Sequence, residues 1–203
     1  MKLYYSPGAC SLASHIVACE AGLDLTLEKV DIGAKKTASG ADYLAINPKG
    51  YVPALQLDDG QLLTEGPVIV QYLADLKPAS GLAPANGSLE RYRLQEWLGY
   101  INAELHKGFG PLFNPATSAE ARAERIAFLN KRFALAEAAL GAKPYLLGER
   151  FSVADAYLFV VAGWSRIVKL DLAAFPNLQA FLKRVSERPG VKAAMVAEGL
   201  IPA

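Results

Sequence analysis

The amino-acid sequence predicts two domains of different class, an α/β domain at the N-terminus and an all-α helical bundle at the C-terminus. Short β-branched and aromatic runs alternate with short helical patterns as far as residue 77. Beyond residue 87, apolar residues recur only at helical spacing. Residues 78–87 form the stretch richest in proline, glycine and small residues. We therefore expect domains at 1–77 and 88–203, joined by a linker at 78–87.

The N-terminal domain is expected to have the element order β-α-β-(α)-β-β-α. The strands are predicted at residues 3–5, 25–30, 54–57 and 61–63, and the helices at residues 12–21 and about 65–77. The turn sequence Asp58-Asp59-Gly60 predicts a hairpin between the last two strands.

The C-terminal domain is expected to be a helical bundle, because its apolar residues form three helical stripes. They are Leu94, Trp97, Leu98, Ile101 and Leu105; Ile126, Leu129, Phe133, Ala136 and Leu140; and Val153, Tyr157, Val160, Val161 and Trp164. Thr117 with Glu120, and Ser152 with Asp155, have the spacing of capping boxes at helix starts. Pro176 and Pro189 mark further helix starts or breaks. The longest apolar run, residues 156–164, is too short to span a membrane and predicts a buried helix.

Charge and cysteine content exclude several classes of function. The 21 Lys and Arg nearly cancel the 20 Asp and Glu, so nucleic acid and anionic membrane are poor candidates for partners. No apolar stretch near residue 1 suits a signal peptide, which predicts a cytoplasmic protein. The two cysteines are expected about 13 Å apart on one helix, too far for a disulfide. Neither they nor the two histidines have the spacing of metal ligands, so no metal is expected.

Cys10 is the strongest candidate for chemistry. It lies between a predicted strand end and the start of an amphipathic helix, where free N–H groups and the helix dipole favour a thiolate. A small buried residue is the alternative interpretation, and it is the preferred one for Cys19 on the apolar face of the same helix. The second cysteine of a Cys-x-x-Cys motif is missing, because Ala13 stands there. Cys10 is therefore expected to form a mixed disulfide with an external thiol or to stabilise that thiol's anion.

Three further positions have plausible binding chemistry. Val52-Pro53 precedes a strand, so its backbone is expected at a sheet edge where an extended peptide could pair. Glu65, beside the start of the helix that contains Pro67, could bind an ammonium while the helix start binds a carboxylate; complementing the helix dipole is an equally good interpretation. His106 is expected at a helix C-terminus that favours its protonated form, in a catalytic or an ordinary capping role. His15 has no evident partner and is interpreted as structural.

These motifs together resemble the cytosolic glutathione S-transferases, specifically the bacterial beta class, over essentially the whole chain. The segments that carry the resemblance are residues 4–11, 47–53, 63–66, 104–107 and 151–155. The resemblance implies a thioredoxin-like N-terminal domain, an all-helical domain that binds the electrophile, a homodimer, a role in detoxification, and glutathione as co-substrate without a metal. It also implies a cis peptide bond before Pro53.

The resemblance further assigns residues to a glutathione site. Cys10 and Ser11 would lie at the glutathione sulfur, Val52 would pair with the cysteinyl part, Glu65 and Gly66 would hold the γ-glutamyl end, and Lys35 the glycyl end. The helical-domain side would comprise Gly99, Ala103, Glu104 and His106. The hydrophobic electrophile is expected against Phe109, Phe113 and Trp164.

Two positions depart from the family pattern. Gly66 replaces a common serine and loses a hydroxyl contact, and Gly99 replaces a frequent asparagine. The sequence from Glu65 to Pro67 resembles family members associated with the degradation of biphenyl and chlorinated aromatics. We expect conjugation of the glutathione thiolate to such electrophiles, with Cys10, Ser11 and His106 as catalytic candidates. The alternatives are a thiol transferase or peroxidase that uses Cys10, and a non-enzymatic protein that binds hydrophobic ligands or a partner.

Overall fold

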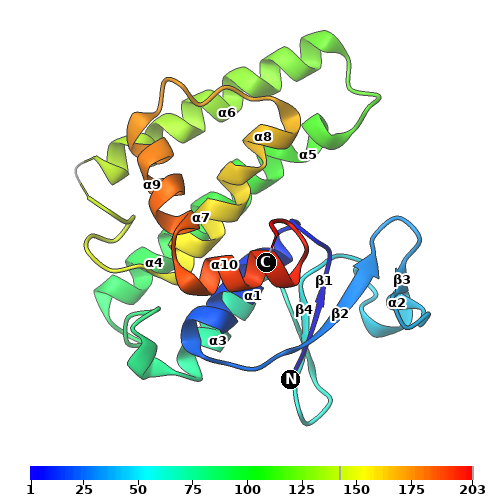
Figure 1. The fold of residues 1–203 in the computed structure, drawn as a ribbon. Helices are drawn as coiled ribbons and strands as arrows, with labels where there is room; N and C mark the ends of the chain where they lie inside the picture. The colour runs from blue at the N-terminus through cyan, green and yellow to red at the C-terminus, as the bar shows by residue number, and fades with distance from the viewer. Residues whose placement is uncertain (142, 203) are drawn as a thin grey trace. The chain divides into compact units, whose positions relative to one another are not determined.

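The structure is a computed structural model that describes residues 1–141 and 143–202 (Figure 1). The described chain divides into two compact units. One contains Met1–Ala83 together with the C-terminal segment from Glu187, and the other contains Pro84–Ser186.

The first unit is built on a mixed five-stranded sheet with the order β3-β2-β1-β4-β5. The strands are β1 (Lys2–Tyr5), β2 (Thr26–Asp31), β3 (Lys36–Thr37), β4 (Ala54–Gln56) and β5 (Leu62–Thr64). β1 and β2 are parallel, whereas β4 runs antiparallel to both β1 and β5. Leu3 and Leu55, which are paired across β1 and β4, have no exposed surface, so the centre of the sheet is core.

Helices complete this unit: α1 (Ser11–Ala21), α2 (Tyr43–Ile46), α3 (Gly66–Asp75), the 3₁₀ turn η1 (Pro78–Ser80) and α10 (Pro189–Ala197). α1 packs against both α3 and α10. It ends at Gly22, whose left-handed φ of 65° lets Gly22 and Leu23 donate hydrogen bonds back to the last turn of the helix. This C-cap explains why the helix stops directly after Ala21.

α10 is held against α1 by ion pairs near both of its ends. Near its C-terminal end, the Glu198 carboxylate accepts hydrogen bonds from His15 Nδ1 at 3.0 Å and from the backbone N–H of Gly8 at 3.0 Å. Towards its N-terminal end, Arg188 forms a two-point ion pair with Glu20. A carboxylate as buried as that of Glu198 is stable only with such partners. The C-terminal segment therefore belongs to the packing of the first unit.

In the described part of the second unit, the regular elements longer than a single β-bridge are helices. Its helices are α4 (Leu89–Tyr100), the π-helix η2 (Ile101–His106), α5 (Lys107–Phe113), α6 (Ala119–Leu140), α7 (Val153–Gly163), α8 (Ser165–Val168) and α9 (Pro176–Ser186). The apolar stripe of α6 is buried at Leu129, Phe133, Ala136 and Leu140. α7 is buried from Val153 to Ala162, as expected of the longest apolar run.

One predicted capping box is confirmed and the other is wrong by one residue. Ser152 and Asp155 cap α7 as expected, with the buried Asp155 carboxylate accepting from Ser152 and from the Leu146 N–H. At α6 the cap is Ser118, whose hydroxyl accepts from the Ala121 N–H. Thr117 instead donates its hydroxyl proton to the Pro111 carbonyl, which removes it from the capping position.

The predicted element order is confirmed, with differences at particular places. The hairpin around Gly60 and the helix starts at Pro176 and Pro189 are present. The two-residue strand β3 was not predicted. β4, which follows Val52, lies between β1 and β5, so β4 is not an edge strand, and the expected pairing of the Val52 backbone with an extended peptide stays a prediction. The residues from Glu187 onwards belong to the first compact unit. The predicted domains at 1–77 and 88–203 and the linker at 78–87 stay a prediction.

The His15–Glu198 pair should make stability depend on pH. Burial lowers the pKa of His15, but hydrogen bonds to Cys19 and Glu198 outweigh it and raise the pKa to about 9. Because the unfolded value is near 6.5, this stabilisation is complete below about pH 6.5 and is lost as pH rises through about 9. We expect His15→Gln to lower the unfolding free energy by about 2–3 kcal/mol at pH 6 and by much less at pH 9.5. Urea unfolding at several pH values measures this, and a pH-independent difference would contradict it.

Candidate functional site

The loop before α1 presents Cys10 at the start of the helix. Cys10 is the N-cap residue of α1, and its Sγ donates a hydrogen bond to the Val52 carbonyl at 3.1 Å. Cys10 is partly exposed and not disulfide-bonded. The buried Ser11 hydroxyl donates to the Ser6 carbonyl and accepts from the Ser6 N–H. Ser11 thus ties the two ends of the loop together, and its predicted catalytic role stays a prediction.

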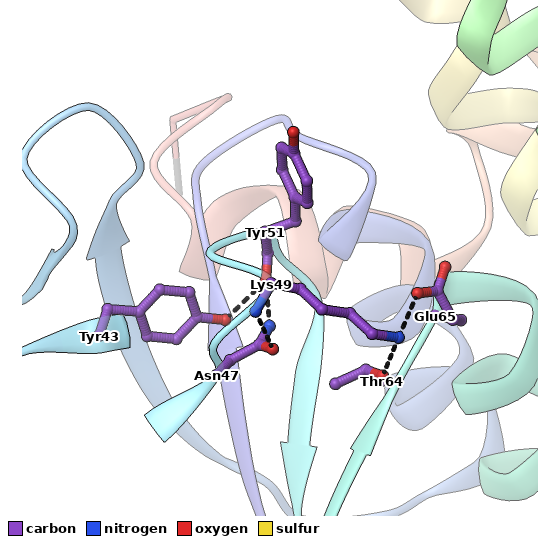
Figure 2. Close-up of polar contacts among 6 residues, drawn as sticks. All are labelled: Tyr43, Asn47, Lys49, Tyr51, Thr64 and Glu65. Carbon is purple, nitrogen blue, oxygen red and sulfur yellow. Dashed lines mark hydrogen bonds and ion pairs between the residues drawn. The ribbon is translucent and has the colours of Figure 1, made fainter. Parts of the chain in front are cut away.

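The segment that carries Val52 and Pro53 is held by buried polar contacts. The Val52-Pro53 peptide bond is cis, which confirms the expectation drawn from the resemblance. Just before it, the Tyr51 carbonyl accepts hydrogen bonds from the Tyr43 hydroxyl and the Asn47 side-chain amide, both at 2.8 Å (Figure 2). Tyr43 has no exposed surface. These contacts fix the backbone that leads into Val52.

Lys35 contacts the same loop. Its ammonium donates to the Gly50 carbonyl at 2.8 Å and lies 5.5 Å from the centre of the Tyr51 ring. Gly50 has a φ of 67°, and a Cβ there would lie 3.0 Å from Leu44 and 3.3 Å from the Lys35 ammonium. Glycine is therefore required at this position by both its backbone conformation and its close neighbours.

Glu65 stands at the start of α3 with an exposed side chain. Its φ is 71°, unusual for a residue other than glycine. Its carboxylate accepts from the Lys49 ammonium at 2.7 Å, and Lys49 also donates to the Thr64 hydroxyl at 3.0 Å (Figure 2). Gly66 begins the helix, and a Cβ there would touch only Pro53, at 3.9 Å. A Cβ would therefore fit at position 66 in ordinary van der Waals contact.

In the second unit, His106 belongs to a hydrogen-bonded chain. Its Nδ1 lies 2.6 Å from the Tyr157 hydroxyl, which donates to Asn102 Oδ1 at 3.0 Å. With the Tyr157 proton donated to Asn102, the Tyr157 oxygen is left to accept from His106, and on this basis we assign the imidazole proton to Nδ1. Nε2 then holds the lone pair. The arrangement makes His106 a neutral hydrogen-bond or proton acceptor at Nε2.

The expected protonated state of His106 is wrong. Burial and the charge of Lys107 lower the pKa of His106 to about 4. The helix also does not end at His106, because the π-helix η2 continues directly into α5. The carbonyls of a helix end, which would favour imidazolium, are therefore not at His106. π-Helical turns inside α-helices occur frequently at functional sites.

The three aromatic residues predicted for the electrophile pocket lie together. Trp164 makes edge contacts with Phe109 at 5.7 Å and Phe113 at 5.6 Å between ring centres, and with His106 at 4.8 Å. Phe109 is fully buried and also contacts Phe133, so it belongs to the helical core. Phe113 is 46% exposed. The structure thus brings these residues to His106, with Phe113 the most accessible.

The remaining predicted residues of the helical side lie on α4 and η2. Gly99 is exposed, and nothing lies within 4 Å of a Cβ placed there. Ala103 is exposed, and the Glu104 carboxylate lies 2.8 Å from Arg132 Nε. Their role in binding glutathione stays a prediction.

Sequence reasoning missed Lys49, Tyr157 and Asn102 as partners of site residues. Tyr157 appeared only as a member of an apolar stripe, and no local pattern connects it with His106, 51 positions earlier. Lys49 lies in a segment that carried the family resemblance, but nothing in that segment indicates its contact with Glu65. Cys19, expected in the core, is partly exposed.

Comparisons with known proteins identify the family of this chain. Models of the glutathione S-transferase N-terminal and C-terminal domains match residues 8–76 and 100–189. The glutathione S-transferase GstA of Escherichia coli O157:H7 is 52% identical over 98% of this chain and 100% of that protein. The chain belongs to the glutathione S-transferase family.

Solved structures place the chain within that family. A ternary complex of BphK, a bacterial glutathione S-transferase, is 60% identical with a TM-score of 0.97, covering 98% of this chain and 100% of that one. A sphingomonad glutathione S-transferase in complex with glutathione is 50% identical with a TM-score of 0.95, covering 99% and 100%. A beta-class enzyme of Sphingomonas chungbukensis is 47% identical with a TM-score of 0.95, covering 99% and 100%. The expected similarity to bacterial beta-class members and the expected fold are confirmed.

Residues 1–141 and 143–202 contain no helix long and apolar enough to cross a membrane. Within the same residues, no three His, Cys, Asp or Glu side chains form a group suited to a metal ion.

The state of His106 is directly measurable. We expect its imidazole to stay neutral from pH 8 to pH 5, with the proton on Nδ1, and to become protonated only near pH 4. Long-range ¹H–¹⁵N NMR reports both the protonation state and the tautomer. Tyr157→Phe removes the acceptor of the Nδ1 proton and should shift the tautomer towards Nε2–H. Protonation of the wild-type ring near pH 6.5 would show that the environment of His106 is different.

Proposed function

We propose that this protein conjugates the glutathione thiolate to hydrophobic electrophiles, as a homodimer in the cytoplasm and in a detoxifying role. One observation supports the proposal above the others. The Cys10 thiol and the Val52 carbonyl, 42 positions apart, are 3.1 Å from each other beside the cis bond to Pro53. The residues assigned by resemblance to the sulfur and to the cysteinyl part of glutathione are therefore adjacent.

Each end of the tripeptide has a chemically matched group in the first unit. Glu65 can bind the α-ammonium of the γ-glutamyl residue, and the N–H groups at the start of α3 can bind its carboxylate. The backbone of Val52 can pair with the cysteinyl part, and Lys35 can bind the glycyl carboxylate. This set would hold the sulfur near Cys10 and the start of α1, where the helix dipole favours a thiolate.

The chemical step requires little beyond a positioned thiolate. The glutathione thiol loses its proton to solvent water, the thiolate sulfur forms a bond to the electrophilic carbon, and for a halogenated aromatic the carbon–halogen bond breaks with loss of halide. The gain comes from the lowered thiol pKa and from positioning. In this proposal Ser11 and His106 assist, and Nε2 of His106 is a hydrogen-bond or proton acceptor. Phe109, Phe113 and Trp164 contact the electrophile.

A thiol transferase or peroxidase activity is the second candidate, favoured by the partly exposed Cys10 thiol. In the transferase reaction the Cys10 thiolate would attack a glutathione mixed disulfide, take the glutathionyl group and release the other thiol. A second glutathione thiolate would then restore Cys10 and form glutathione disulfide. A purely non-enzymatic binding protein is disfavoured, because it would have no use for Cys10, Pro53 and Glu65 together.

Activity is tested with glutathione and a chlorinated dinitrobenzene, against the spontaneous reaction without enzyme. We expect a clear rate above background. Cys10→Ala separates the two candidate activities: full conjugation by this variant would confine Cys10 to redox chemistry. Mass spectrometry under mild oxidation should detect a glutathione adduct on Cys10 if the thiol transferase reaction occurs. No conjugation despite glutathione binding would favour the redox reaction, and no binding would favour the non-enzymatic alternative.

The contribution of Glu65 is tested separately. We expect Glu65→Gln to weaken glutathione binding by about two- to ten-fold, because the carboxylate that accepts from the ammonium is lost but is largely exposed. Isothermal titration calorimetry measures the change. Glu96→Gln is a matched control, because Glu96 is an exposed residue of α4 that pairs with Arg93. Equal affinities of Glu65→Gln and the wild type would remove Glu65 from the proposed site.

A further inference from the structure

The carboxylate proposed to bind the ammonium of glutathione already has an ammonium partner within the chain. Lys49 Nζ lies 2.7 Å from Glu65 Oε1 and 3.0 Å from the Thr64 hydroxyl (Figure 2). A lysine ammonium and the α-ammonium of a γ-glutamyl group are both primary –NH₃⁺ groups that donate the same kind of hydrogen bond. Lys49 therefore makes the same hydrogen bond to Glu65 that we propose for the ammonium of glutathione.

The position of Lys49 follows from the rigid loop that carries it. The Lys49 N–H donates to Asn47 Oδ1 at 3.2 Å, and the Asn47 amide donates to the Tyr51 carbonyl at 2.8 Å. The Tyr43 hydroxyl donates to the same carbonyl at 2.8 Å. The loop backbone is thus held on both sides of Lys49. Figure 2 shows the Lys49 side chain extended from this loop to Thr64 and Glu65.

We propose that Lys49 is an exchangeable counter-ion that competes with the α-ammonium of glutathione for Glu65 and so tunes affinity for γ-glutamyl ligands. The proposal rests on the glutathione site proposed above and deepens it. When the tripeptide binds, its ammonium replaces Lys49 on the Glu65 carboxylate, and the Lys49 side chain turns to solvent. No covalent step is involved.

The solvent exposure of the pair makes this exchange feasible. The side chains of Lys49 and Glu65 are 55% and 58% exposed. Exposed ion pairs of this kind contribute little, so displacing Lys49 should weaken glutathione binding by only about two- to five-fold. A buried pair would instead exclude the ligand, because breaking it would leave an uncompensated charge. The exposed Lys49–Glu65 pair would therefore lower the affinity for glutathione without preventing its binding.

The competition should be specific for ligands that carry the ammonium. Butyryl-cysteinylglycine, in which hydrogens replace both the α-ammonium and the α-carboxylate, would leave Lys49 on Glu65. N-terminally deaminated glutathione, which keeps the α-carboxylate, would equally leave the pair intact. For these analogues, removal of Lys49 should bring no gain in affinity.

The test is glutathione affinity by isothermal titration calorimetry for the wild type, Lys49→Met and Lys77→Met. Methionine keeps the length and apolar stem of lysine but removes its charge. Lys77 is exposed beyond the far end of α3, about 18 Å from Glu65 at the helical rise per residue and outside the screening length at physiological salt. We expect Lys49→Met to bind glutathione about two- to five-fold more tightly than the wild type, and Lys77→Met to bind like the wild type.

Other results would overturn the proposal. Weaker binding by Lys49→Met would show that Lys49 is itself a ligand for the glutathione carboxylate. Unchanged binding would show that the Lys49–Glu65 contact does not compete. An equal gain with the deaminated analogue would indicate a general charge effect. In a Glu65→Gln background, Lys49→Met should have no effect, and a persisting gain would also contradict the competition.

The outcome is separable from that of the proposed function. Calorimetry measures binding whether or not the protein conjugates any electrophile. If wild-type glutathione binding is measurable and the Lys49 variant is unchanged, the competition is wrong and the transferase proposal stands. If neither the wild type nor either lysine variant binds glutathione, both proposals are overturned.

Discussion

The candidate site in the first unit depends on the hydrogen bonds that the buried Glu198 carboxylate accepts. One oxygen accepts from His15 in the middle of α1, and the other from the backbone of Gly8 in the loop that leads to Cys10. Gly8 has a φ of 70°, and a Cβ there would lie 3.4 Å from the Leu200 side chain. The C-terminal segment thus fixes both the helix that presents the thiol and the loop before it. The position of Cys10 follows from residues almost the whole chain away.

Local elements were predictable from the sequence because their signals are local. Turn residues define the hairpin around Gly60, and proline marks the starts of α9 and α10. The packing of α10 against α1 was not predictable, because the interacting residues are 183 positions apart and no pattern connects them. The interpretation of His15 as structural agrees with its burial, but its partner Glu198 could not have been identified. The capping error at Thr117 arose because two adjacent hydroxyl residues compete and tertiary contacts decide between them.

In the candidate site too, residue types could be predicted from the sequence and their long-range contacts could not. Residue types and their order along the chain indicated the thiol and the acidic residue, and the family resemblance added the cis bond before Pro53, but neither showed what each residue contacts. In the structure each has an internal partner: Cys10 donates to Val52, Lys35 to Gly50, and Lys49 to Glu65. In the proposed site, binding would exchange these contacts for contacts with the tripeptide. The free energy of binding would then be a difference between two similar sets of interactions, which the sequence alone does not specify.

The π-helix between α4 and α5 also has a consequence for helical phase. A wider turn is equivalent to one extra residue in an otherwise continuous α-helix. At 3.6 residues per turn, one residue corresponds to a rotation of about 100°. The residues from Lys107 to Phe113 are therefore turned by about that angle relative to α4 from where a regular helix would put them. Deleting a single residue within 101–106 would restore regular hydrogen bonding and yet direct Phe109 and Phe113 away from Trp164. The angular position of Phe109 and Phe113 relative to α4 thus depends on one residue of chain length.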